Sequence, residues 1–274
     1  MKLTWAAAVV LGLGLAAMAG AQNAPNTPRA MGMGSAVIGV ADDAGAWAQN
    51  PAGLGALHVR TQDGKAFGND VVIALGKVRP GNDTALGINW SGWNPLTTVG
   101  FGAGLNRMGD TKTFGAGVGM GYRNSMLTWG VDVRRVERDT RDDTVFEVGA
   151  MYRIVQSDGA NTRLGLKIFD LGNATDMGPQ VGLGVGWPAT ENLFVAVDLV
   201  DVLCKTSDGP YLNGGVEYKL GQAKEWRARG GFYDTGDSHK LTLGVGLVLA
   251  KVRLDVGYMN TDSSSWMAGA GFDF

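Results

Sequence analysis

The sequence predicts an all-β protein, a transmembrane antiparallel β-barrel of about fourteen strands. Large apolar residues alternate with Gly, polar or charged residues over most of the chain. The alternating stretches are near the roughly 9–11 residues that a tilted strand needs to cross a bilayer. The 274 residues include 44 Gly without a Gly-X-Y period, which excludes collagen. A hydrophobic content of 45% and a formal net charge of −2 exclude a disordered polyelectrolyte and argue against nucleic acid as a partner.

The first 21 residues predict a cleaved secretory signal peptide. Lys2 gives a positive start, an apolar run follows from Ala6 to Ala17, and Ala19-Gly20-Ala21 fits a small-x-small cleavage site. The alternative is a membrane anchor, but the run is shorter than the roughly 20 residues of a helical span. The expected organisation is a signal peptide over 1–21, an N-terminal segment over 22–60 and a barrel over 61–274.

Strands with two unlike faces are predicted from about Val71 onward, because the side chains repeat with period 2. In Thr113–Arg123 apolar side chains alternate with Gly, and in Val252–Tyr258 they alternate with charge or Gly. The expected strands are 71–78, 84–92, 98–107, 113–123, 126–137, 144–153, 162–169, 179–188, 193–202, 211–220, 225–233, 239–249, 252–260 and 266–274. In a barrel the apolar face would meet lipid; a soluble β-sandwich would show the same alternation.

The connections between these strands differ at the two ends of the predicted barrel. All the odd-numbered connections, from 80–83 to 260–265, contain Asp, whereas even-numbered ones such as Asn124-Ser125 and Ala250-Lys251 are mostly tight. Outer-membrane barrels have short periplasmic turns and longer extracellular loops. The even-numbered connections are therefore expected on the periplasmic side.

The last strand carries a more specific pattern. Trp266, Ala268, Ala270, Phe272 and Phe274 alternate up to a terminal Phe, which resembles the signal read by the machinery that inserts outer-membrane barrels. Phe272 and Phe274 are the candidate insertion signal. Together with the signal peptide, this predicts the outer membrane of a Gram-negative type cell, with the barrel-assembly machinery and outer-membrane lipid as partners.

Charged residues on the Gly-rich face are expected to point into the lumen. They carry both signs, and buried charges of mixed sign require partners, so pairing with one another and with the N-terminal segment is expected rather than a selectivity ring. The candidate lumen charges are Asp132, Glu147, Arg227, Arg229, Arg253, Asp255 and Asp273.

The stretch before the first strand resembles a known family. It contains Gly32 and Gly34, then Ala41-Asp42-Asp43-Ala44, then Asn50-Pro51-Ala52-Gly53-Leu54. This order is similar to the opening of the FadL-type outer-membrane transporters and of the related PorV, PorQ and UPF0164 barrels. The resemblance implies a fourteen-stranded barrel with this segment folded into the lumen as a plug. The plug or gate candidates are Gly32, Gly34, Asp42, Asp43, Asn50, Pro51, Gly53 and Leu54.

The same residues have a physical interpretation. Asp42 and Asp43 are expected to cap a short helix over 44–49, because a carboxylate accepts the free N–H groups at a helix N-terminus. Asn50-Pro51 should then end the helix. Gly on the lumen face would let a plug backbone approach the wall closely. These features fit either a gate or a structural brace, and the brace is favoured because caps and stops need no ligand.

No enzyme, cofactor or metal centre is expected. His58 and His239 are far apart in sequence, and Cys204 has no recognisable catalytic neighbourhood. Gly115-Ala-Gly117 alternates along a strand instead of opening a helix, so a nucleotide-binding loop does not fit.

The resemblance implies passive uptake of hydrophobic small molecules, such as long-chain fatty acids, across the outer membrane. The alternative is a non-transporting scaffold like PorV, whose partners are secretion-system proteins, and a third is a purely structural barrel. Short predicted loops weaken the transport hypothesis, because an external capture groove needs longer ones. A continuous apolar tunnel beside Asp42–Leu54 would support transport, whereas a lumen filled by charge pairs would support a scaffold.

Overall fold

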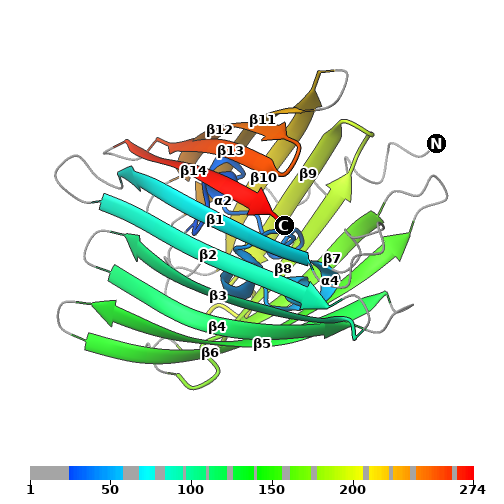
Figure 1. Ribbon diagram of the computed structural model, residues 1–274. Coiled ribbons are helices and arrows are strands. Elements are labelled where there is room, and N and C mark those ends of the chain that lie inside the picture. Colours follow the sequence, from blue (N-terminus) through cyan, green and yellow to red (C-terminus); the bar gives the residue numbers. More distant parts are fainter. Residues whose placement is uncertain are drawn as a thin grey trace.

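Fourteen antiparallel strands close into a barrel in which each strand pairs with its sequence neighbours and β14 returns to β1 (Figure 1). The computed structural model describes residues 25–57, 68–77, 84–94, 97–108, 111–121, 126–138, 141–155, 161–173, 178–205, 210–221, 225–234, 239–260 and 264–274. The strands are β1 (Gly68–Lys77), β2 (Thr84–Asn94), β3 (Val99–Met108), β4 (Thr111–Gly121), β5 (Leu127–Arg138), β6 (Arg141–Val155), β7 (Asn161–Phe169), β8 (Gln180–Pro188), β9 (Leu193–Val200), β10 (Tyr211–Leu220), β11 (Trp226–Asp234), β12 (His239–Leu249), β13 (Val252–Met259) and β14 (Ser265–Asp273). The predicted barrel is confirmed; the predicted signal peptide and His58 lie outside the described residues.

The pairing of β1 with β14 closes the sheet. Asp70 lies opposite Asp273, and Asn69 exchanges backbone hydrogen bonds of 3.0 and 3.1 Å with Phe274. Closure removes the free strand edges that would otherwise pair with other chains. The predicted strand ends are correct to within three residues. The first strand begins at Gly68 because Gly68–Asp70 pairs with Ser91–Trp93, although its sequence lacks the apolar alternation.

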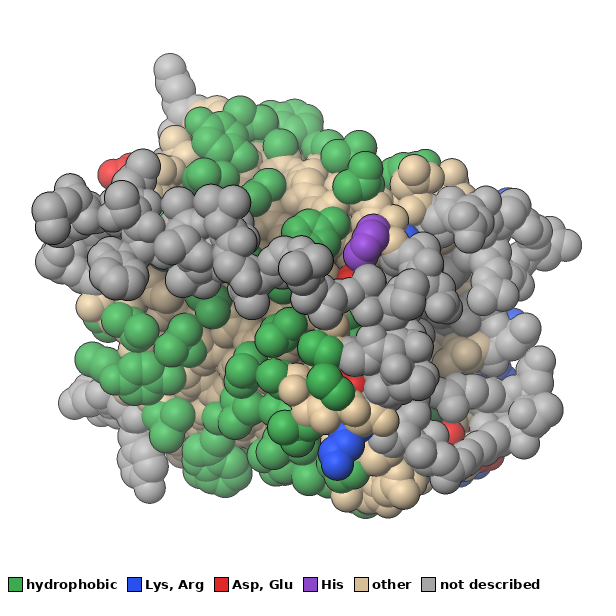
Figure 2. All heavy atoms as spheres, turned by 180° about the vertical axis from the view of Figure 1, so that it is seen from behind, with side chains coloured by type: hydrophobic (Ala, Val, Ile, Leu, Met, Phe, Trp, Pro, Cys, Tyr) green, Lys and Arg blue, Asp and Glu red, His purple; other side chains and the backbone are tan. Residues whose placement is uncertain are grey.

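The outer face of the barrel is apolar. Leu241 and Leu243 on β12 are 67% and 62% exposed, and Figure 2 shows hydrophobic side chains spread across one side of the barrel. The predicted assignment of faces is therefore confirmed, and the surface is that of a transmembrane barrel of the outer-membrane type. Trp90, Trp129, Trp226 and Trp266 are exposed on this face.

An Arg substitution at Leu243 tests the lipid-facing surface. Leu243 lies near the middle of β12, where an Arg on the lipid face costs about 2–4 kcal/mol, falling to about 0–1 kcal/mol near the interface. We expect Leu243→Arg to lower the free energy of unfolding from vesicles by about 2–4 kcal/mol, measured by urea titration. The matched control Leu249→Arg, at the end of the same strand, should have little effect. Equal losses for the two variants would contradict a membrane-embedded outer face.

Residues 25–57 lie inside the barrel and are called the lumenal segment here (Figure 1). The segment contains three short helices, α2 (Pro28–Gly32), α3 (Ala46–Gln49) and α4 (Ala52–Ala56). Trp47 and Leu54 are fully buried in one apolar cluster, beside Trp93 of β2. None of the helices in the described ranges is long and apolar enough to span a membrane. The segment therefore has its own apolar core, which packs against the inner wall.

Candidate functional site

Glycines on the inner face let the lumenal segment approach the wall backbone to backbone. A Cβ added to Gly119 of β4 would lie 2.5 Å from the backbone nitrogen of Gly55, and one added to Gly184 of β8 would lie 2.5 Å from that of Gly39. Any side chain at these positions would push the two backbones apart. The predicted role of the lumen-facing Gly residues is thus seen directly.

The Gly candidates of the segment also make close contacts. Gly34 has a φ of 62°, and a Cβ there would collide with the carbonyl oxygens of Phe232 and Gly214. Gly32 faces the backbone of Gly244, and Gly53 packs against Ala41 within the segment. All three act as contact points between backbones.

Asn50, Pro51 and Leu54 hold the turn between α3 and α4. Asn50 has φ −158°, so α3 ends at Gln49 as predicted. The Asn50 Nδ2 donates to the carbonyl of Ile38 at 2.8 Å, and Oδ1 accepts from the N–H of Ala52 at 3.1 Å. Pro51 directly precedes α4, and Leu54 is fully buried. These contacts are internal to the protein, as a brace requires.

The predicted capping by Asp42 and Asp43 is wrong. Helix α3 begins at Ala46 after Gly45, with no side-chain cap. Asp43 instead accepts the N–H of Gly45 at 2.8 Å in a local turn. Asp42 turns away and pairs with Arg29 at 2.5 Å and Arg163 of β7 at 3.0 Å. Two guanidinium groups thus outcompete the helix N-terminus for the Asp42 carboxylate, since charge-assisted bonds are the stronger ones.

Arg29 of α2 joins the lumenal segment to the wall. Its Nη1 contacts Asp42, and its Nε lies 3.3 Å from the Glu217 carboxylate on β10. Burial alone would lower the pKa of Arg29, but the carboxylates of Asp42, Glu217 and Asp43 outweigh it and hold the pKa well above its usual value. Arg29 therefore stays charged at every physiological pH.

Asp198 of β9, the strand that pairs with β10, attaches the middle of the segment to the wall. Its Oδ2 accepts the backbone N–H groups of Val37 at 2.6 Å and Ile38 at 2.8 Å. The side chain is completely buried. One carboxylate therefore satisfies two backbone donors of a segment that has no helix at this point.

Within the described ranges, six of the seven predicted lumen charges form ion pairs, several of them with unpredicted partners. Arg229 bridges Glu217 and Asp255 at 2.7 and 2.6 Å, and Arg253 pairs with Asp70. Arg134 pairs with Asp132 at 3.1 Å and also with Glu147, which contacts Lys167 at 2.6 Å. Arg227 lies 4.0 Å from Glu217, and Asp273 lies opposite Asp70 in the ladder.

Sequence reasoning missed several of these partners as site residues. Glu217 and Lys167 occupy positions of their strands that alternate with the apolar face, so the sequence pattern could have predicted that they point inward. Arg29 lies outside any strand, so no such pattern applies to it. The missed residues are Arg29, Asp70, Arg134, Arg163, Lys167, Asp198 and Glu217.

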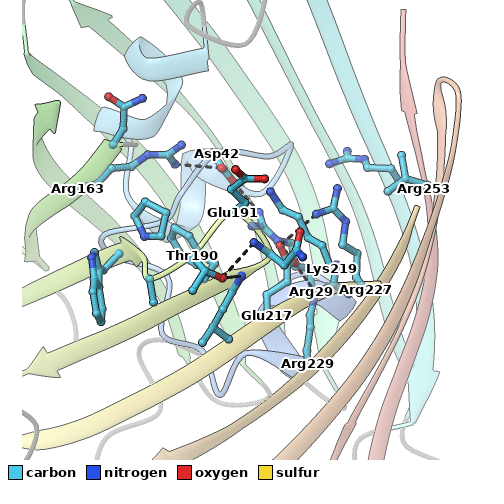
Figure 3. Close-up of a pocket in the computed structure, with 18 of the residues that line it drawn as sticks. Arg29, Asp42, Arg163, Thr190, Glu191, Glu217, Lys219, Arg227, Arg229 and Arg253 are labelled. Carbon is cyan, nitrogen blue, oxygen red and sulfur yellow. Dashed lines mark hydrogen bonds and ion pairs between the residues drawn. The ribbon is translucent and has the colours of Figure 1, made fainter. Parts of the chain in front are cut away.

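A pocket of about 730 Å³ lies between the segment and the wall, beside the β8–β9 turn. Figure 3 shows Arg29, Arg163, Arg227, Arg229 and Arg253 around it, together with Asp42 and Glu217. Trp187 and Phe194 supply apolar surface on the same wall. The turn belongs to the even-numbered connections, at the end predicted to face the periplasm.

The two residues of the predicted barrel-insertion signal lie outside the pocket. Phe272 and Phe274 are exposed on the outer face at the end of β14. Within the described part of the chain, no group of three or more His, Cys, Asp or Glu side chains could hold a metal ion.

Comparisons with known proteins concern the fold alone. No protein-family model and no curated protein matches the chain. Among solved structures, it is similar to a triple mutant of the Rh. blastica porin, with 12% sequence identity, a TM-score of 0.47, and coverage of 76% of this chain and 99% of that chain. A second triple mutant of the Rhodopseudomonas blastica porin gives 13% identity, a TM-score of 0.43 and the same coverage. On its own strand ladders and apolar exterior, the chain is a closed fourteen-stranded transmembrane β-barrel of the outer-membrane type.

Proposed function

We propose that this protein is a non-enzymatic outer-membrane scaffold whose barrel is occluded by its own N-terminal segment. The observation that carries the proposal is the attachment of the lumenal segment, at Asp42, Val37 and Ile38, to charged side chains of the wall. The apolar exterior and the alternating last strand support the outer membrane as its location. A scaffold of this kind would act as a partner of secretion-system proteins.

Charge in the lumen argues against a hydrophobic passage. A hydrocarbon chain in the pocket would displace water from Arg29, Arg163 and Arg229, and the loss of hydration of charged groups is costly. Beside Asp42, the described residues form ion pairs rather than an apolar tunnel. This arrangement favours the scaffold over uptake.

Uptake of hydrophobic small molecules is the second candidate. The N-terminal motif favours it through the family resemblance, and Trp187 and Phe194 give one wall of the pocket an apolar surface. Fatty acids are the substrate class that this candidate implies.

Permeability of the intact chain separates the two candidates. Full-length protein in liposomes is expected to pass neither small sugars in a swelling assay nor a labelled fatty acid above the rate of empty liposomes, because the segment lies in the lumen and is attached to the wall. A general porin serves as the positive control. Fatty-acid uptake well above the empty-liposome rate would overturn the scaffold proposal and support transport.

A positive test of the scaffold uses its native membrane. Chemical cross-linking in intact cells, followed by purification of the barrel, should yield a stoichiometric outer-membrane protein partner. Recovery of the barrel alone at every cross-linker length would contradict a scaffold.

A further inference from the structure

The pocket has a cationic lining. Its basic side chains come from α2, β7, β10, β11 and β13, so they converge from separate elements (Figure 3). The lining cations are Arg29, Arg163, Lys219, Arg227, Arg229 and Arg253. The lining carboxylates are Asp42, Glu191, Glu217 and Asp255.

The charged side chains of the lining differ in exposure: Arg163, Arg227 and Arg253 are more exposed than the carboxylates they pair with, whereas Arg229 is 4% exposed and its partner Asp255 is 17% exposed. The side chains of Arg163 and Arg227 are 25% and 21% exposed, whereas that of Glu217 is 7% exposed. Asp70, the partner of Arg253, is completely buried, and Asp43 is nearly so. Arg163 and Arg227 are therefore the guanidinium groups of the lining that are most accessible to an entering solute.

Guanidinium donors also remain available. The hydrogen bonds of Arg29 and Arg229 to described residues use Nε and Nη1 only. Those of Arg163 use Nη1 only. Each of the three side chains thus keeps an Nη2 group with two N–H donors. The planar fork of Arg matches the oxygens of phosphate and carboxylate groups, and such charge-assisted bonds are strong.

We propose that this pocket binds a small solute that carries at least two negative charges on phosphate or carboxylate groups. Arg29, Arg163 and Arg229 supply the donors, and Trp187 and Phe194 shape the rim. A volume of about 730 Å³ lies within the size range of small-molecule sites. The inference does not depend on the scaffold role, because it concerns occupancy of the pocket and not passage through the barrel.

Calorimetric titration of the purified full-length protein in detergent tests the site. Inorganic pyrophosphate and citrate are the probes, at low and at physiological salt. We expect saturable binding at one site, and Arg163→Gln should weaken it at least about 10-fold, as loss of a charge-assisted pair does. Arg163→Lys keeps the positive charge but not the planar guanidinium group, so its affinity should lie between those of the wild type and Arg163→Gln. The matched control is Arg135→Gln on β5, whose side chain pairs with Asp142 on the exterior.

A further titration with a lipid probe distinguishes a lipid headgroup from a free solute as the source of the anion. The probe is a short-chain phosphatidic acid below its micelle concentration, which carries the phosphate chemistry of a lipid headgroup. If it binds more tightly than pyrophosphate, the site is assigned to lipid. If pyrophosphate binds more tightly, the site is assigned to a free solute. Absence of saturable binding of every probe to the wild type would overturn the proposal. So would an equal loss for Arg163→Gln and Arg135→Gln. If Arg163→Gln does not fold, the wild-type titration and Arg163→Lys decide the question.

Discussion

Asp198→Ala is expected to detach the middle of the lumenal segment from the wall. The Asp198 carboxylate accepts from Val37 and Ile38, and its removal leaves two buried N–H groups without an acceptor. Each such group costs about 1–3 kcal/mol, so a loss of about 2–6 kcal/mol in the free energy of unfolding is expected. Urea unfolding in detergent measures this loss, and limited proteolysis should show new cleavage between Met33 and Asp42.

Asp142→Asn is the matched control for Asp198→Ala. Asp142 lies on the exterior and pairs with Arg135 at 2.7 Å. Exposed ion pairs contribute about 0–1 kcal/mol, so this variant should unfold close to the wild type. If Asp198→Ala were as stable and as protease-resistant as Asp142→Asn, the carboxylate would not hold the segment in place.

Gly231→Val is expected to prevent docking of the segment at β11. A Cβ at Gly231 would lie 2.8 Å from the backbone nitrogen of Gly34 in the lumenal segment, and 2.5 Å from the carbonyl oxygen of Gly214 on the neighbouring strand β10. Backbone atoms cannot rotate away as a side chain can, so the cost should reach or exceed the roughly 1–3 kcal/mol typical of overpacking. Thermal unfolding monitored by the mobility shift on gels should show the loss.

The neighbouring Gly230 provides a control with the same chemistry. A Cβ there has only the carbonyl oxygen of Thr242 within reach, at 3.9 Å. Gly230→Val should therefore be tolerated, and Val also favours the strand conformation. A result in which both variants lose the same stability would show that the effect belongs to the strand and not to the docked segment.

The barrel was predictable because its signal is local. Alternation along each strand fixes which side chains point inward, so Glu147 and Arg229 were placed correctly before any partner was known. The lumenal segment depends on distant partners instead. Asp42 is drawn from its expected capping role by Arg163, and Arg29 reaches Glu217 across 188 positions of sequence. No periodicity encodes such pairs, and the pocket, which lies between the segment and the β8–β9 turn, could not be predicted either.

The path of the lumenal segment constrains the order of assembly. Pro28 lies against Gly257 and Gly269 of β13 and β14, Ile38 against Gly182 of β8, and Gly55 against Met120 of β4. The part of the segment that leaves the ribosome first thus contacts strands that are made last. The α2 end of the segment therefore cannot reach its final position before β13 and β14 are in place, although its later part could already contact β4 and β8.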